Sequence, residues 1–429
     1  MSTPELACYS TLKSWLDDCA GGFHPNTRFN EDHSGSHIVT TDDLEKDFTV
    51  VSCPFRLVIS QALAKRAVMN ILGGLEDLKN VQWSERQWIC TYISLHWIVG
   101  PEENMDYLAH FEYINTLPTA EKLRTPLHFF ASELQLFKGT NIYGATGDRE
   151  RDWKFEWNQC CSVVRQSNHL WGELFTWLVY LEYYFLHWCS YNQRDKYLTS
   201  ATYLSSRAFP SSLLADTPSL VRTPSTEPVL IPGVDSLNHA RGQPVSWFVT
   251  YPTSTVATSC QEPKISLVLH SSAVKGQELF NNYGPKPNSE LILGYGFSIP
   301  NNPDDTIVLK VGGIGGNRWE IGRGAENIEG MWKEILSALL DSEKSMPTYE
   351  DILDASGMLQ DMVETLIERL PAEQASNPAE VRPEVFVMFL HYLEGQRDIL
   401  QSIVEFAKAR EQEAVEMARH DGIDVVLED

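Results

Sequence analysis

Two stretches in the middle of the chain decide its fold: Pro232-Gly233-Val234-Asp235-Ser236-Leu237-Asn238-His239 and Gly276-Gln277-Glu278-Leu279-Phe280-Asn281-Asn282-Tyr283-Gly284. The second continues into Asn288-Ser289-Glu290-Leu291 and Gly294-Tyr295-Gly296-Phe297. An Asn-His pair alone usually marks a turn or a satisfied buried amide, and a Tyr-Gly dipeptide usually marks a strand end. Here two Tyr-Gly dipeptides stand twelve residues apart behind an Asn-His pair. Their combination indicates a functional site, because each Gly lets the backbone bend close to a ligand.

The regions around these stretches alternate between strand and helix patterns. Short apolar runs between turn residues predict strands, and apolar residues three and four positions apart predict helices. A polar stretch covers 25–36, and a proline-rich surface connection covers 210–232. The expected strands are 37–41, 48–51, 244–251, 265–270 and 306–311, and the expected helices are 5–20, most of 61–195, 328–340, 358–370 and 385–409. This order predicts an α+β protein, as one β domain with a helical insertion or as several separate domains.

The size and charge of the chain limit its function class. With 429 residues it exceeds one ordinary core, so we expect two or three domains. A hydrophobic content of 43% is typical of a folded globule. The formal net charge of −24 argues against general nucleic-acid binding, which needs basic surface to displace counterions from phosphates. An acidic surface serves solubility, or it attracts a basic partner.

The cysteines and the apolar segments indicate an intracellular protein. The eight cysteines form no C-x-x-C pair, so we expect reduced thiols and a location in the cytoplasm or the nucleus. The first twenty residues contain charges that are atypical of a secretory signal. The most apolar run, 170–191, is interrupted by Glu173, Glu182 and His187, which predicts a buried aromatic helix and no membrane span. No Cys or carboxylate cluster accompanies the Asn-His pair, so we expect no metal.

The two stretches together resemble the C-terminal half of a SET domain, the catalytic module of many protein-lysine methyltransferases. They look most like the Rubisco-lysine-methyltransferase type, whose SET domain is split by a helical insertion. Further motifs of that type follow in the expected order: Tyr107-Leu108, Leu117-Pro118, Thr125-Pro126-Leu127, Glu133-Leu134, Gly139-Thr140 and Ser206-Arg207-Ala208-Phe209.

The resemblance implies an α+β fold: a β-rich SET domain interrupted by a helical insertion and followed by an all-helical C-terminal domain. The N-terminal helix and the first half of the SET domain would cover 1–100, and the insertion 101–205. The second half of the SET domain, with the catalytic motifs, would cover 206–310. A helical domain resembling the family's substrate-binding domain would cover 311–429.

The resemblance also assigns roles to individual residues. Tyr283 corresponds to the catalytic tyrosine, and Tyr295 to a tyrosine of the channel that admits the substrate lysine. In the D-x-x-N-H motif the Asn binds the amino-acid part of S-adenosylmethionine, and the main chain of Asn-His holds its adenine. Arg207 corresponds to the arginine that pairs with the cofactor carboxylate, a bidentate geometry that suits a guanidinium. The cofactor-binding residues implied in this way are Gly35, His37, Arg207, Asp235, Asn238, His239, Tyr283, Gly296 and Phe297.

These residue types suit methyl transfer to a lysine. The reaction is an in-line displacement, so positioning supplies much of the catalysis. The lysine amine must be neutral to attack, although its reference pKa is about 10.4. A narrow apolar channel lowers that pKa by desolvating the ammonium. Tyrosines wall such a channel with rigid rings and orient the amine through their hydroxyls.

One position departs from the family pattern. The family opens its first strand with a G-x-G turn that touches the cofactor, whereas this chain has Gly35-Ser36-His37. We expect the side chain of His37 to crowd the turn or to force a different backbone path. The cofactor would then sit differently or bind more weakly, or activity would be lost.

We therefore interpret the chain as an S-adenosylmethionine-dependent protein-lysine N-methyltransferase with a non-histone, basic protein substrate, such as a ribosomal protein. We expect a monomer that binds neither nucleic acid nor membranes. Two alternatives stay open: a catalytically inactive SET-fold binding protein, motivated by His37, and a protein-histidine methyltransferase. The tyrosine at 295 favours lysine over histidine.

Overall fold

The computed structural model of the chain describes residues 5–32, 35–73, 81–101, 106–177, 195–251, 262–312, 316–340, 346–373 and 378–425. The chain forms two compact units, each built from segments that are separate in sequence. The first unit contains residues 1–123 and 149–284, and the second contains residues 124–148 and 285–429. Each unit is described by itself below.

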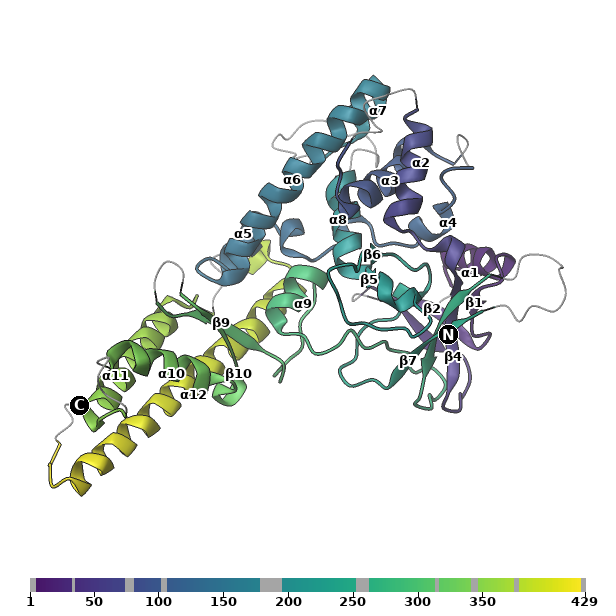
Figure 1. The fold of residues 1–429 in the computed structure, drawn as a ribbon. Helices are drawn as coiled ribbons and strands as arrows, with labels where there is room; N and C mark the ends of the chain where they lie inside the picture. Colours follow the sequence, from purple (N-terminus) through teal and green to yellow (C-terminus); the bar gives the residue numbers. More distant parts are fainter. Residues whose placement is uncertain are drawn as a thin grey trace. The chain divides into compact units, whose positions relative to one another are not determined.

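The first unit is built around a four-stranded antiparallel sheet with the strand order β1-β4-β8-β7. Two-stranded pairs, β2 with β3 and β5 with β6, lie beside it in Figure 1. The strands are β1 (Gly22–Phe23), β2 (Thr27–Asp32), β3 (Gly35–Thr40), β4 (Phe48–Pro54), β5 (Phe209–Pro210), β6 (Pro228–Val229), β7 (Val245–Thr250) and β8 (Lys264–Leu269). Strand β4 pairs with β8 over a sequence separation of more than 200 residues, so the helical insertion leaves the sheet continuous.

Helices cover the rest of the first unit. They are α1 (Ala7–Asp18), α2 (Gln61–Ile71), α3 (Glu85–Val99), α4 (Phe111–Ile114), α7 (His169–Leu174), α8 (Lys196–Arg207) and most of α6 (Asn141–Ser167). Helix α3 packs against both α2 and α8, and ten consecutive residues of it, from Gln87 to His96, are buried. A helix that is buried on all sides must begin with satisfied donors, and the Ser84 hydroxyl accepts the Gln87 N–H there in a capping box.

The second unit is mostly helical. It contains α5 (Ala131–Leu136), α9 (Asn288–Tyr295), α10 (Ile328–Leu339), α11 (Tyr349–Arg369), α12 (Pro383–His420) and the strand pair β9 (Thr306–Lys310) and β10 (Arg318–Gly322). The 38-residue helix α12 runs beside α11, and both appear at the lower left of Figure 1. Buried aliphatic and aromatic side chains of α10, α11 and α12 form one core, and a second core joins α5, α9 and the start of α12.

Most expected elements are confirmed, including the helix near 5–20 and the five strands. Strand β2 lies within the polar stretch 25–36, where no strand was expected, and it pairs along its whole length with β3. That strand buries only alternate positions, Thr27 and Phe29, so its other side chains are polar. The expected last helix was too short, since α12 continues past 409 to His420. The expected aromatic helix of 170–191 is described only to 177, and its remaining part lies outside the described residues.

The described cysteines, six of the eight, are free thiols. Within the described ranges, no helix is long and apolar enough to cross a membrane. The domain boundaries expected at 100, 205 and 310 stay predictions.

Candidate active site

Three segments of the first unit meet at the candidate site: β3, the Asn-His stretch and the stretch that leads to Tyr283. Backbone hydrogen bonds join them in pairs. The Leu279 N–H donates to the Ile38 carbonyl at 2.8 Å, and the Asn281 N–H donates to the Asn238 carbonyl at 2.7 Å. The Ala240 N–H returns a bond of 2.9 Å to Asn281. The two stretches that first singled out this chain are therefore in direct contact.

Tyr283 is held by the Asn-His stretch at three points. Its hydroxyl donates to the Leu237 carbonyl at 2.8 Å. Its ring lies almost parallel to the ring of His239, with centroids 5.1 Å apart and planes inclined by 22°. Its backbone N–H donates to His239 Nδ1 at 3.0 Å, so the neutral imidazole carries its proton on Nε2. These contacts fix both the direction of the phenol and the position of its oxygen.

Asp235 and Arg207 form an ion pair beside this tyrosine. Arg207 Nη1 lies 3.2 Å from Asp235 Oδ2 and also donates to the Asp235 carbonyl at 3.0 Å. The Tyr113 hydroxyl donates to the same Oδ2 at 2.7 Å. Burial raises the pKa of the Asp235 carboxyl, and the charge of Arg207 opposes that effect. Burial, followed by the nearby Asp235 charge, raises the pKa of Tyr113, so its phenol stays a donor.

This pair has unused hydrogen-bonding capacity at two points. The Asp235 side chain is 1% exposed, yet its Oδ1 is buried without a hydrogen-bond donor among the described residues. The Arg207 side chain is 21% exposed, and within the same ranges its hydrogen bonds use Nη1 alone. Its remaining N–H groups suit an oxyanion such as a carboxylate.

Asn238 is oriented by a carboxylate. Its Nδ2 donates to Glu278 Oε1 at 2.9 Å, and Glu278 itself lies opposite Val39 of β3 in an isolated antiparallel bridge. The amide oxygen of Asn238 is thereby set in one orientation, because the amide N–H₂ is committed to the glutamate. Glu278 thus has a specific function in the motif: it connects the Asn to the first strand of the site.

The expected crowding at His37 does not occur. Its ring turns onto the paired strand, where Nε2 lies 3.1 Å from Asn30 Nδ2 and Nδ1 lies 3.9 Å from Asp32. Asn30 stands opposite His37 in the register of the β2–β3 pair, and His37 is 7% exposed. Gly35 keeps a positive φ of 117°, a conformation that glycine adopts without strain. The cross-strand pair therefore accommodates the histidine within a regular strand.

Tyr295, Gly296 and Phe297 lie at the C-terminal end of α9 in the second unit. Gly296 ends this helix in the left-handed conformation with φ 79°, and a Cβ there would lie 2.8 Å from the Arg124 carbonyl carbon. The glycine is thus required by both backbone conformation and close packing. The Nζ of Lys286 lies 5.6 Å from the centroid of the Tyr295 ring, within reach of a cation–π contact.

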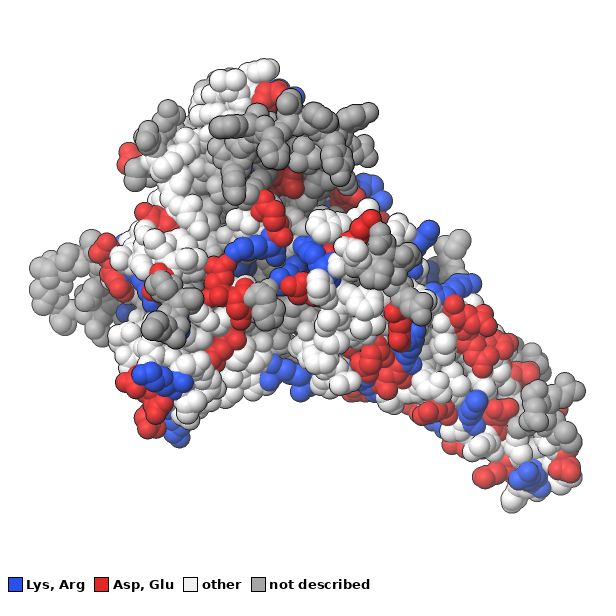
Figure 2. All heavy atoms as spheres, turned by 180° about the vertical axis from the view of Figure 1, so that it is seen from behind, with Lys and Arg blue, Asp and Glu red and all other residues white. Residues whose placement is uncertain are grey.

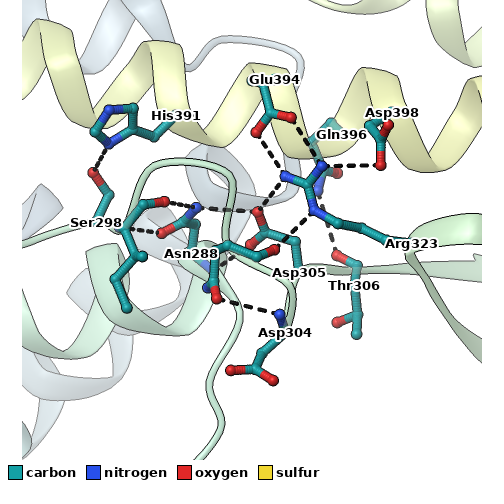
Figure 3. Close-up of polar contacts among 12 residues, drawn as sticks. Asn288, Ser298, Asp304, Asp305, Thr306, Arg323, His391, Glu394, Gln396 and Asp398 are labelled. Atoms are coloured by element: carbon teal, nitrogen blue, oxygen red, sulfur yellow. Dashed lines mark hydrogen bonds and ion pairs between the residues drawn. The ribbon is translucent and has the colours of Figure 1, made fainter. Parts of the chain in front are cut away.

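The start of α9 is anchored by a buried polar network that the sequence did not indicate (Figure 3). Asp305 Oδ1 accepts the backbone N–H of Asn288 at 2.6 Å, and Oδ2 accepts the Asn288 amide at 3.1 Å. Both side chains are almost completely buried. Arg323 contacts Asp305 at 3.4 Å and also pairs with Glu394 and Asp398 of α12. A carboxylate at the first N–H of a helix satisfies an orphan donor and suits the helix dipole.

The sequence interpretation brought together Gly35, His37, Arg207, Asp235, Asn238, His239 and Tyr283, all of which lie in the first unit. It missed Tyr113, which holds Asp235, and Asn30, which holds His37. Neither had a signal in the sequence, because each contact depends on tertiary packing. Among the described residues, no group of His, Cys, Asp or Glu is arranged to hold a metal ion.

The sequence is similar to known lysine N-methyltransferases. No family model matches the sequence. The ribosomal lysine N-methyltransferase set10 of Schizosaccharomyces pombe is 31% identical over 278 residues, which is 65% of this chain and 42% of that protein. Ribosomal lysine N-methyltransferase 1 of Saccharomyces cerevisiae is 31% identical over 46% of this chain and 34% of its own length. The protein-lysine N-methyltransferase EFM1 of the same yeast is 29% identical over 45% and 34%. The chain thus spans less than half the length of the curated relatives it matches.

Solved structures with the same architecture are SET-domain proteins. The SET domain of LSMT bound to lysine and AdoHcy superimposes with a TM-score of 0.68 at 15% identity, over 96% of this chain and 94% of that one. Rubisco LSMT bound to AdoMet gives a TM-score of 0.66 at 15% identity, over 97% and 94%. The chain therefore has the fold of the SET domain of Rubisco LSMT, including a helical C-terminal region.

Proposed function

We propose that this protein is an S-adenosylmethionine-dependent protein-lysine N-methyltransferase. The observation that carries the proposal is the fixed phenol of Tyr283, whose hydroxyl donates to the Leu237 carbonyl and whose ring packs on His239. The Asn-His stretch that would bind the cofactor is thereby the same stretch that orients the tyrosine. The names of the relatives, all lysine N-methyltransferases, support the same assignment.

The residues beside Tyr283 fit the charges of S-adenosylmethionine, which supplies the methyl group when bound. Its α-carboxylate would pair with the N–H groups of Arg207 that point away from Asp235. Its α-ammonium would find an acceptor in the Asn238 amide oxygen, which the Glu278 carboxylate orients. His37, turned onto Asn30, leaves the Gly35 backbone available to the cofactor. This accommodation supports an active enzyme over an inactive binding protein.

Tyr283 would act on the incoming amine through its oxygen. The phenol proton is donated to the Leu237 carbonyl, and the phenolic oxygen can accept hydrogen bonds through its lone pairs. An acceptor at this point would orient the N–H groups of the amine and aim its lone pair at the methyl group, a positioning effect. Tyr295 would help form the lysine channel, where desolvation keeps the amine neutral.

We infer that the substrate is a lysine in a basic protein of the translation apparatus, such as a ribosomal protein. Two of the relatives are named ribosomal lysine N-methyltransferases. The net charge of −24 would attract a basic substrate and raise its encounter rate. The helical region from 311 to 429 would bind the substrate protein, and the enzyme would act as a monomer in the cytoplasm or the nucleus.

The test is transfer of a labelled methyl group from S-adenosylmethionine to purified ribosomal proteins, followed by mass spectrometry of the modified residue. We expect labelled lysine, with the rate reduced by about 10²-fold or more in Tyr283→Phe, as expected for loss of a positioned group. Tyr251→Phe is the matched control, because Tyr251, the residue that follows β7, is exposed. Absence of labelling, or labelling that Tyr283→Phe leaves unchanged, would contradict the proposal. Label found on histidine would favour the alternative of a protein-histidine methyltransferase.

A further inference from the structure

A second cavity of the first unit shares no side chain with the candidate active site. Its volume is about 340 Å³, at the lower end of the range for small-molecule sites. It is bounded by the first turn of α3, the middle of α6, the C-terminal end of α8 and the β5–β6 connection. The proposed methyltransferase activity uses none of these elements except the end of α8.

Two arginines that line the cavity lie against the same tryptophan. The guanidinium carbons of Arg86 and Arg149 each lie 5.3 Å from the centroid of the Trp153 ring. Trp153 is 5% exposed, and Arg86 is further locked by Glu156, with Nε–Oε2 and Nη2–Oε1 distances of 2.8 Å. A guanidinium held in this way loses little rotamer entropy when it binds a ligand.

The charge on this wall is unusual for so acidic a chain. Burial lowers the pKa of Arg149, and the neighbouring charge of Arg86 lowers it further. Arg222, on the exposed β5–β6 connection, adds a third guanidinium to the lining. Figure 2 shows basic side chains gathered in a hollow of the back face, flanked by acidic ones. A ligand oxyanion would relieve the repulsion between these half-buried arginines through charge-assisted hydrogen bonds.

Other lining residues suit an organic body rather than a bare ion. Phe209, Pro210 and Pro228 supply apolar surface, and Glu85 and Glu227 supply carboxylates in the same lining. Carboxylates accept hydrogen bonds from hydroxyl and amino groups. The cavity is also several times larger than one water molecule, whose share of liquid volume is about 30 Å³.

We propose that this cavity binds a phosphate monoester with a ring-shaped body, of the size of a nucleoside monophosphate. Arg149 and Arg222 contact the phosphate, the apolar wall contacts the ring, and the two glutamates accept hydrogen bonds from hydroxyl or amino groups. This site is independent of the proposed methyl transfer.

The test is a calorimetric titration of the full chain with uridine monophosphate, in the presence of saturating S-adenosylhomocysteine to keep the nucleotide out of the other site. We expect sub-millimolar binding that weakens about tenfold in Arg222→Gln and in Arg149→Gln, a loss of about 1.4 kcal/mol each. Arg151→Gln is the matched control, since Arg151 is an exposed residue of the same helix outside the cavity lining. Circular dichroism checks the fold of each variant, and Arg222, exposed on a connection, keeps the test valid if Arg149→Gln unfolds.

Two further probes separate the parts of the ligand. Uridine, which lacks the phosphate, and inorganic phosphate, which lacks the ring, should each bind at least about tenfold more weakly than uridine monophosphate. The proposal is overturned by the absence of binding at millimolar nucleotide, by arginine variants that bind like the parent, or by a single part that binds as tightly as the whole ligand. Equal weakening of uridine monophosphate binding by Arg151→Gln would also overturn the proposal, because it would show a general effect of charge.

Discussion

Replacement of Asp305 by asparagine should destabilise the second unit, because the carboxylate accepts hydrogen bonds that an amide cannot accept together. Asp305 is 2% exposed and receives the Asn288 N–H at 2.6 Å, the Asn288 amide at 3.1 Å and Arg323 Nη2 at 3.4 Å. In Asp305→Asn one carboxylate oxygen becomes an N–H₂ group that faces these donors. The close approach of α12 leaves no room to turn away, since a Cβ at Gly395 would lie 2.3 Å from Asp305 Oδ2.

The size of the loss follows from the contacts. A hydrogen bond to a charged group contributes about 1.5–3 kcal/mol, so one lost bond and one weakened bond give about 3 kcal/mol. Arg323 keeps its ion pairs with Glu394 and Asp398, so the desolvation of its guanidinium adds little to the loss of stability. For a folding unit of roughly 150–250 residues, 1 kcal/mol shifts Tm by about 2–4 °C, which predicts a decrease of about 6–12 °C.

The assay is thermal and urea unfolding of the full chain, combined with hydrogen–deuterium exchange to locate the change. We expect faster exchange in α9 and in residues 298–306, with unchanged exchange in β7 and β8. Asp304→Asn is the matched control, because Figure 3 shows the Asp304 carboxylate turned away from the network while only its backbone N–H takes part. The reasoning is refuted if Asp305→Asn costs less than about 1 kcal/mol, or if Asp304→Asn costs as much.

Three further predictions concern stability. Glu133→Gln should lower the free energy of unfolding in urea by about 3 kcal/mol or more, because the fully buried Glu133 accepts two Arg382 guanidinium N–H groups at 2.8 Å. A loss below about 1 kcal/mol would contradict the buried ion pair. Burial lowers the pKa of His96 to about 3 and that of His110 to about 4, so the unfolded chain binds more protons than the folded chain below pH 6.5. The free energy of unfolding should therefore be highest above that pH and fall by about 3 kcal/mol per histidine towards pH 4. An unfolding free energy that does not change between pH 7 and pH 4.5 would be inconsistent with neutral buried rings. Ser84→Ala should cost about 1 kcal/mol and speed exchange in the first turn of α3, whereas unchanged exchange would show that the cap contributes nothing.

The site could be recognised from the sequence because its key contacts join the two stretches. Tyr283 contacts Leu237 and His239 of the Asn-His stretch, and both stretches are short enough to be identified by residue type and order. The five expected strands were equally predictable, since short apolar runs between turn residues indicate strands. The polar strand β2 was missed because its pattern is set by pairing with β3, which the local sequence does not encode.

Only the tertiary structure shows where the side chain of the unusual residue at position 37 lies. In sequence, a histidine in place of glycine reads as a side chain that crowds the turn. In the folded chain its ring bonds to Asn30 across the β2–β3 pair, and the strand stays regular. Asp235 illustrates the same limit, because its partner Tyr113 comes from a helix 122 residues earlier in the chain. Residue type and local spacing thus fix which groups are available, whereas the partners that orient them depend on packing between segments far apart in sequence.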